Sequence, residues 1–297
     1  MRPSFIWRLR TRELELGRRT LIMGVLNVTP DSFSDGGRFF EPAAAVQHAL
    51  GMLDAGADLI DIGGESTRPG SQAAPEAEAA AGLPEEEELR RVMPVVEALR
   101  RERPQAILSI DTYKAAVARA AVEAGAEIVN DVSALRWDPA MAAAVAELGC
   151  GVVLMHMRGH PAEWRKLPPL EDGIALVSRE LRQWAETAMA AGIARQRMVL
   201  DPGFGFGKNF SENYPLLARF EEFHRLGFPL LAGPSRKSFI GRTLARDGRD
   251  APPDERLYGT LAAVTACILK GAHIVRVHDV KAALDAARIA DAILAAV

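Results

Sequence analysis

The sequence has few cysteines and contains no apolar run long enough to cross a membrane. Only two of its 297 residues are cysteine, Cys150 and Cys267, and both lie in apolar sequence. Two thiols are too few for a thiolate zinc site, so we expect buried free cysteines, which suit a reducing cytoplasm. The apolar segment 261–269 is too short to span a bilayer, and residues 1–19 lack the continuous apolar stretch of a signal peptide. These features predict a cytoplasmic protein with no membrane partner.

The sequence also lacks an excess of positive charge. Lysine and arginine number 36 against 39 aspartates and glutamates, which gives a formal net charge of −3. A protein without a global basic field is not expected to have nucleic acid as its main partner, although a local cationic pocket could still bind a small anion. The length and the 48% hydrophobic content predict one domain that spans residues 1–297.

What the sequence does contain is a repeated pattern. About eight short apolar runs each stop abruptly on polar residues of the kind that active sites use, and helical sequence follows each time. The runs, with the polar residues that follow or end them, are 21–26 with Asn27, 59–62 with Glu65, Thr67 and Arg68, 107–110 with Asp111, 128–129 with Asn130, 152–154 with Met155 and His156, 198–200 with Asp201, 230–233 with Ser235, Arg236 and Lys237, and 274–277 with Arg276, His278 and Asp279.

This alternation predicts an α/β protein with a parallel sheet. Eight strands favour a closed (β/α)8 TIM barrel over an open doubly wound sheet, and in a barrel all the strand ends meet at one face. Segments 5–9 and 13–16, which a polar turn separates, predict a short N-terminal β-hairpin that covers the bottom of the barrel. Helical sequence is predicted at 43–55, 86–101, 114–124, 140–148, 174–191, 214–226, 257–270 and 280–297.

Two segments that follow strands are candidate lids. Residues 29–37 are dense in turn formers and hydroxyls, and residues 67–84 are rich in proline, glycine and alanine without apolar periodicity. Loops at the catalytic face of a barrel commonly exclude water when substrate binds. The alternative is plain surface linkers, and for residues 73–88 a solvated linker that leads into a helix is the favoured interpretation.

Asp111, Asn130 and Asp201 emerge from strongly apolar sequence at the ends of different strands. A carboxylate accepts two parallel N–H bonds from an amino-pyrimidinone edge, an amide both donates and accepts, and Lys237 can donate to a ring oxygen or nitrogen. The set therefore suits a pterin or purine-like heterocycle. The alternative is that these groups cap helices or pair with one another, and Asp111 in particular could be an N-cap.

A second group of residues is cationic. Arg68, Arg276 and His278 could hold a phosphate or pyrophosphate, and the two-residue spacing of Arg276 and His278 puts both side chains on one face of an extended strand. The alternative is a structural salt bridge with Asp279 or Glu65. Mg²⁺ often takes only one or two protein ligands, with phosphates and water supplying the rest, and Asn27 is the candidate ligand.

The segment 201–208, DPGFGFGK, does not have the spacing of a dinucleotide-binding loop. Its alternating glycines let the backbone turn tightly, so that Phe206 can offer a flat face to a ring or an aryl amine, while Phe204 is expected in the core.

Four segments together resemble the signature segments of the dihydropteroate synthase family. They are MGVLNVTPDSFSDGG at 23–37, DIGGESTRPG at 61–70, DPGFGFGK at 201–208 and SRKS at 235–238. The resemblance extends over nearly the whole chain. It implies a (β/α)8 transferase of folate biosynthesis that joins 6-hydroxymethyl-7,8-dihydropterin pyrophosphate to p-aminobenzoate with Mg²⁺ as cofactor. It further implies a homodimer and a sulfonamide target.

The resemblance also implies roles for residues at matching positions. Asp111, Lys237, Arg276 and His278 would be catalytic. The implied pterin contacts are Asp111, Asn130, Met155, Asp201, Phe206 and Lys237; those for pyrophosphate are Asn27, Arg68, Arg276 and His278, with Asn27 on the metal; and those for p-aminobenzoate are Thr67, Arg68, Pro69, Phe206, Lys237 and Ser238.

The sequence departs from the family pattern at Pro234, where a hydroxyl residue is usual, and in a longer second loop at 70–88. These departures bear on loop closure and on affinity for p-aminobenzoate or sulfonamides. Three other interpretations stay open: a folate-binding module of a corrinoid methyltransferase, a catalytically silent paralogue, and a phosphate-binding barrel isomerase. Segments 257–270 and 280–297 are apolar enough for a dimer surface, although core packing would explain them too.

Overall fold

The computed structural model describes residues 2–29, 42–65 and 82–296. The strands within these residues are β1 (Phe5–Arg8), β2 (Glu13–Leu16), β3 (Leu21–Asn27), β4 (Leu59–Gly63), β5 (Ile107–Asp111), β6 (Ile128–Asp131), β7 (Gly151–Met155), β8 (Met198–Asp201), β9 (Leu231–Ala232) and β10 (Ile274–Val277). The α-helices are α1 (Pro42–Asp54), α3 (Glu85–Glu102), α4 (Ala115–Glu123), α5 (Met141–Leu148), α6 (Gly173–Ala190), α7 (Asn213–Ala218), α8 (Ser238–Thr243), α9 (Leu257–Leu269) and α10 (Val280–Ala295).

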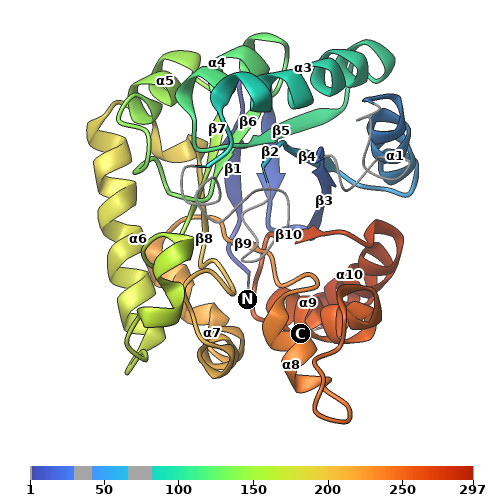
Figure 1. Cartoon of the computed structure of the whole chain (residues 1–297), viewed down its shortest axis with the longest axis vertical. Coiled ribbons are helices and arrows are strands. Elements are labelled where there is room, and N and C mark those ends of the chain that lie inside the picture. The colour runs from blue at the N-terminus through green and yellow to red at the C-terminus, as the bar shows by residue number, and fades with distance from the viewer. Residues whose placement is uncertain (1, 30–41, 66–81, 297) are drawn as a thin grey trace.

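Strands β3 to β10 form an eight-stranded parallel barrel. Their order in the sheet is β8, β7, β6, β5, β4, β3, β10, β9. The two outer strands of this order meet through a parallel bridge between Leu200 and Leu230, where the amide of Leu200 donates to the carbonyl of Pro229 at 3.0 Å. The helices surround the strands in a ring (Figure 1). The predicted (β/α)8 barrel is confirmed.

The strands are almost continuously apolar because both of their faces are buried. One face points to the surrounding helices, and those helices present an apolar stripe to it: in α3, Val92, Val95, Val96 and Leu99 recur at helical spacing and are fully buried. The other face fills the barrel interior with a layer made of Leu21, Met23, Leu59, Ile128, Val153, Val199, Leu231 and Ile274.

The N-terminal hairpin of β1 and β2 covers the amino end of this barrel, as predicted. Phe5 pairs with Leu16 and Arg8 with Glu13 in an antiparallel register. Trp7, Leu9 and Leu16 of this region pack into the same buried cluster as the interior layer. The indole Nε1 of Trp7 donates to the carbonyl of Arg197 at 2.8 Å, which satisfies its only polar atom. The hairpin is therefore part of the core, on the side away from the strand ends that carry the polar residues.

We expect Trp7→Ala to lower the free energy of unfolding by about 3–5 kcal/mol, because it removes a fully buried indole and leaves a cavity at the bottom of the barrel. Urea unfolding followed by circular dichroism measures this. Ile6→Ala is the matched control, because Ile6 lies on the outer face of the same strand and is 48% exposed. A change for Trp7→Ala no larger than for Ile6→Ala would contradict the packing described here.

The structure also bears on the predicted cysteines, membrane spans and the helix at 214–226. The cysteines are free and buried, as predicted, and burial raises the pKa of Cys150 to about 11. Among the described residues no helix is long and apolar enough to span a membrane. The helix predicted at 214–226 is wrong as one element: α7 ends at Ala218, and a 3₁₀ segment, Phe220–Leu226, follows, because three-residue spacing buries Phe220, Phe223 and Leu226 together.

Candidate active site

The polar residues predicted from the strand ends come together at the carboxyl end of the barrel. Asn27, Asp111, Met155 and Asp201 are the last residues of their strands, Asn130 is the next to last residue of β6, and Arg276 lies within β10. Neighbouring strands carry these positions side by side, since Asp111 pairs with Asn130 and Met155 with Asp201. One polar cluster is therefore assembled from residues up to 249 positions apart, from Asn27 to Arg276.

Arg276 is the centre of this group. Its Nε donates to Oδ2 of Asp61 at 2.6 Å and its Nη2 donates to Oδ2 of Asp111 at 2.7 Å. The same Asp61 oxygen accepts from Nδ2 of Asn130 at 2.8 Å. Burial alone would lower the pKa of Arg276, but the two carboxylates hold it above its ordinary value. The guanidinium is a permanent cation whose direction is fixed by two carboxylates on neighbouring strands.

These contacts decide between the alternatives left open by the sequence. Asp111 is not the N-cap of α4, because Lys114 occupies that position and the amide of Ala115 donates to Asp138. Asp111 and Asn130 do pair within the site, but with Arg276 and Asp61 respectively, at the face where a ligand would meet them. The pairing that the sequence analysis gave as the alternative is thus present, and the binding of a ligand at these residues stays a prediction.

Asp61 belongs to this cluster, although the pattern of strand ends did not reveal it. It lies inside the apolar run of β4, is fully buried, and its Oδ1 has no hydrogen-bond partner. A carboxylate at such a position is costly unless a cation compensates it, and Arg276 supplies that charge. An acidic residue in the middle of an otherwise apolar strand could have indicated a functional carboxylate. The prediction considered only residues at strand ends and therefore did not include Asp61.

Burial also changes the carboxyl groups of the site. It raises the pKa of Asp201 to about 6, although the amide of Gly203 donates to Oδ1 at 2.8 Å and Lys237 and Lys208 oppose the change. Burial likewise raises the pKa of Asp111, opposed mainly by Arg276 and reinforced by Asp61. Carboxyl groups with raised pKa values at a pocket are typical of functional sites.

The loop after β8 places Phe206 beside Lys237. The Nζ of Lys237 lies 3.8 Å from the centre of the Phe206 ring, and the ring of Trp164 meets Phe206 edge-on at 5.7 Å. The loop approaches β7 so closely that a Cβ at Gly203, whose φ is +68°, would collide with the carbonyl oxygen of His156. Phe204 is buried against Phe220 and Phe239, as predicted for a core residue.

His278 and Arg276 do not share a partner among the described residues. The Nδ1 of His278 lies 2.9 Å from Oγ of Ser235, and its backbone amide donates to the same oxygen at 3.2 Å. The alternative salt bridge to Asp279 is not formed by Arg276, since Asp279 pairs with Arg236, whose Nε donates to Oδ2 at 3.0 Å. That Arg276 and His278 bind one anion together stays a prediction.

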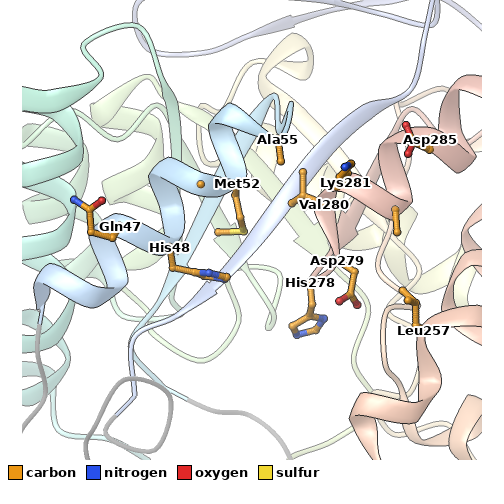
Figure 2. Close-up of a pocket in the computed structure, with 12 residues that line it drawn as sticks. Gln47, His48, Met52, Ala55, Leu257, His278, Asp279, Val280, Lys281 and Asp285 are labelled. Atoms are coloured by element: carbon orange, nitrogen blue, oxygen red, sulfur yellow. The ribbon is translucent and has the colours of Figure 1, made fainter.

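A groove of about 650 Å³ leads away from His278 between α1 and α10. Figure 2 shows His48 and Met52 of α1 lying across from His278 and Val280, and all four line the groove. Apart from His278, the groove contains none of the predicted site residues. The candidate ligand site therefore stays at Arg276 and its partners at the strand ends, and the groove is a separate feature that adjoins His278.

A second ionic cluster lies beside Asp111. Lys114 donates to Glu65 at 2.7 Å and also pairs with Glu88, and the hydroxyl of Tyr113 donates to Glu65 at 3.0 Å. Glu88 is only 1% exposed. The predicted helix start within 73–88 is confirmed, because α3 begins at Glu85. The predicted solvation is wrong at Glu88, because Lys114 compensates its charge and lets it be buried.

Some predicted residues are not placed by the structure. Thr67, Arg68 and Pro69, and nearly all of both candidate lids at 29–37 and 67–84, lie outside the described residues. Ser238 is described and is the exposed first residue of α8. Among the described residues there is no group of three or more histidine, cysteine, aspartate or glutamate side chains that could hold a metal ion.

The barrel and its polar end define the class of the protein: an α/β barrel that gathers polar groups at the carboxyl ends of its strands, the face at which barrel enzymes carry their active sites. The chain matches the family described as pterin binding enzyme over residues 23–278. It is 48% identical to the dihydropteroate synthase of Escherichia coli K12 over 275 residues, which are 93% of this chain and 92% of that protein. It is 44% identical to the dihydropteroate synthase of Bacillus subtilis, over 95% of this chain and 91% of that one.

Solved structures agree with these relatives. The dihydropteroate synthase of Xanthomonas albilineans with 4-aminobenzoic acid has a TM-score of 0.87 and 45% identity, with 99% of each chain covered. The Yersinia pestis dihydropteroate synthase in a sulfonamide drug complex has the same TM-score and identity, over 99% of this chain and all of that one. The chain belongs to the pterin-binding enzyme family and, within it, to the dihydropteroate synthases.

Proposed function

We propose that this chain condenses 6-hydroxymethyl-7,8-dihydropterin pyrophosphate with p-aminobenzoate to give 7,8-dihydropteroate and pyrophosphate. The observation that carries the proposal is the convergence of Asp111, Asn130 and Asp201 beside the Arg276 cation. Carboxylate and amide groups suit the amino-pyrimidinone edge of a pterin, and a permanent cation suits a departing anion. Relatives support it, since a Xanthomonas albilineans dihydropteroate synthase of 43% identity is described in complex with 7,8-dihydropteroate.

In the proposed mechanism pyrophosphate leaves before the amine attacks. Breaking the C–O bond to pyrophosphate leaves a cation on the pterin methylene, and the neutral aryl amine then forms the new C–N bond and releases a proton. Asp111 faces the developing cation, and Arg276 and His278 stabilise the leaving anion. Asn130 and Asp201 hold the pterin, and Lys237 and Phe206 border the aryl amine. No protein nucleophile is needed, so the protein contributes charge placement and exclusion of water.

Magnesium is part of this proposal. Asn27 ends β3, is half-buried, and offers an amide oxygen of the hard donor type that Mg²⁺ accepts. A single protein ligand is compatible with Mg²⁺ when substrate phosphates and water complete the shell. When bound, the ion would neutralise charge on the pyrophosphate.

The test is to incubate the purified protein with dihydropterin pyrophosphate, p-aminobenzoate and Mg²⁺ and to follow dihydropteroate and pyrophosphate, omitting each component in turn. The proposal expects product only when all three are present. Pterin binding without product would contradict it and favour a silent paralogue, or a folate-binding methyl-transfer module if methyltetrahydrofolate also binds. Product without Mg²⁺ would contradict the metal role alone.

Pterin affinity is expected to fall as the pH is lowered through about 6. The pKa of Asp201 in the free protein is raised to about 6 by burial, so below that value the carboxyl is protonated and can no longer accept two N–H bonds. Isothermal titration with the pterin alcohol between pH 8 and 5 measures this. Asp201→Asn should bind weakly at every pH and lose the part of the dependence near pH 6, while Asp111, whose pKa burial also raises, keeps its own part; an unchanged profile in that variant would contradict the assignment.

We further propose that sulfonamides compete with p-aminobenzoate here, in line with the described Yersinia pestis complex. Pro234 is buried between β9 and Ser235, and its carbonyl accepts from the amide of Lys237 at 3.2 Å. Pro234 therefore sets the backbone that leads to Lys237. Inhibition of turnover that p-aminobenzoate relieves is the expected result, and Pro234→Ser tests whether this departure alters the affinity.

We also propose a cytoplasmic homodimer. The two buried free cysteines suit a reducing compartment. Helices α9 and α10 carry apolar side chains that are exposed in a single chain: Tyr258 at 82%, Ile289 at 65% and Ile293 at 48%. A second copy that buries these residues would remove them from water. Light scattering should give twice the mass of one chain, and Ile289→Glu should give a monomer; a monomeric wild-type protein would contradict the dimer.

A further inference from the structure

Lys208 is a buried cation for which the mechanism above has no role. Its side chain is almost completely buried, with 6% of the residue exposed. The Nζ donates to the carbonyls of Gly203 at 2.7 Å, His156 at 3.2 Å and Phe206 at 3.2 Å. A lysine ammonium has three N–H donors, and here each meets one backbone carbonyl. Among the described residues this ammonium forms no salt bridge with a carboxylate.

The three carbonyls belong to two different connections of the barrel. His156 follows β7, whereas Gly203 and Phe206 lie in the loop between β8 and α7. The same two connections approach closely elsewhere: Nη1 of Arg158 donates to the carbonyl of Gly207 at 3.1 Å, and a Cβ at Gly207 would lie 2.5 Å from the carbonyl oxygen of Arg158. Lys208 therefore fastens the loop after β8 to the end of β7.

This loop carries one wall of the candidate aryl amine site. The carbonyl of Phe206 is one of the three acceptors of the Lys208 ammonium. The ring of the same residue lies under Lys237, whose Nζ is 3.8 Å from the ring centre. On its other side the loop is held by Asn213, whose Oδ1 accepts from the amide of Gly205 at 2.7 Å. Without Lys208, the three buried carbonyls would lose their hydrogen-bond donor, and the loop would no longer be held in this position.

We propose that Lys208 is a positioning residue for the aryl amine substrate: its ammonium fixes the loop between β8 and α7 so that Phe206 and Lys237 form the wall of the p-aminobenzoate site. The inference rests on the proposed function. Loss of Lys208 should therefore weaken binding of p-aminobenzoate, whereas the pterin contacts of Asp111 and Asn130 should not depend on it.

The charge state of Lys208 gives this role a pH dependence. Burial lowers its pKa to about 7, opposed by Asp201 and Glu180 and reinforced by Lys237 and Arg158. The group therefore loses its proton as the pH rises through about 7, and an amine has only two N–H donors for three carbonyls. The neighbouring His156 stays neutral throughout, because burial lowers its pKa to about 3. The loop should be held best below pH 7.

The first test compares Lys208→Met with Lys270→Met, in which a half-exposed lysine of a surface pair with Glu221 is removed. For Lys208→Met we expect the KM for p-aminobenzoate to rise about 10-fold, as for the loss of one buried charged hydrogen bond. The Kd for the pterin alcohol should change clearly less than this KM, because the loop carries only some of the pterin contacts, and Lys270→Met should match the wild type. Equal losses for both ligands, or an unchanged KM, would overturn the inference.

Two further measurements do not depend on that comparison. In the wild type, the KM for p-aminobenzoate at saturating pterin substrate should rise between pH 6 and pH 8.5. The substrate itself does not cause this rise, because both of its ionisable groups titrate at acid pH. A KM that does not change with pH would overturn the role of Lys208. Hydrogen exchange at residues 203–207 should be faster in Lys208→Met, and this needs no turnover. Inactive wild-type protein with the expected exchange difference would refute the proposed function and leave the fastening of the loop standing.

Discussion

Replacement of Arg276 by alanine is expected to lower kcat about 10²–10³-fold, the range seen when one preorganised group that stabilises developing charge is removed. Arg276 is held by Asp61 at 2.6 Å and Asp111 at 2.7 Å, and it is the described cation closest to those carboxylates at the strand ends. Its contribution should be largest when pyrophosphate departs, because negative charge then collects on the leaving group. Single-turnover measurement of pyrophosphate release reports this step directly.

The pterin alcohol separates this role from simple binding, because it lacks the pyrophosphate. We expect Arg276→Ala to change its Kd far less than it changes the rate. Loss of the guanidinium also removes the main group that opposes the raised pKa of Asp111. Protonated Asp111 would then weaken pterin binding for a different reason, so the Kd of the pterin alcohol is measured over a range of pH for both proteins.

Arg182→Ala, at an exposed position of α6, is the control and should behave as the wild type. Equal effects of Arg276→Ala on pyrophosphate release and on binding of the pterin alcohol would refute the assignment of Arg276 to the leaving group.

Replacement of Asp61 by asparagine should be nearly as damaging, although we expect Asp61 to act through Arg276 and Asn130. One Oδ2 accepts from Arg276 and from Asn130, so it fixes a cation and an amide on two different strands. Asparagine keeps the size but loses the charge, which leaves Arg276 with only the Asp111 carboxylate. We expect kcat/KM to fall about 10–100-fold and the free energy of unfolding to fall by about 1–3 kcal/mol.

A double-mutant cycle distinguishes a positioning role from an independent one. If Asp61 acts by orienting Arg276, then Asp61→Asn combined with Arg276→Ala should be little slower than Arg276→Ala alone. The free energy of unfolding is measured separately for each variant, because the double variant removes the buried cation together with the charge that compensates it. Two rate losses that simply multiply would exclude the coupling that the geometry indicates.

The order of strands and helices was predictable from the sequence because it depends on local patterns. Short apolar runs that end on Asn27, Asp111 or Asp201 alternate with helical segments, and this alternation is sufficient to indicate a parallel barrel with its polar residues at one end. The hairpin was predictable for the same reason, since segments 5–9 and 13–16 are apolar and separated by a polar turn. The helix at 214–226 was not, because its division at Arg219 depends on which face the barrel buries.

The site was predictable to the extent that its residues end strands. Asp61 was overlooked because it lies within an apolar run, and only its pairing with Arg276, 215 residues away, explains a buried carboxylate there. Lys208 was assigned no role, since its three acceptors include His156, which is 52 residues away in the sequence. Glu88 was expected to be solvated, and its burial depends on Lys114 of another connection.

By itself the sequence determined the barrel, the end of it at which the polar residues gather, and the chemical types of those groups, because apolar periodicity and residue chemistry are local properties. Only the tertiary structure decided which of those groups touch. Arg276 is bound by Asp61 and Asp111 and not by Asp279, and Lys208 fastens one loop to another. Such pairings arise from charges brought together by strand closure and from the cost of burying any of them alone.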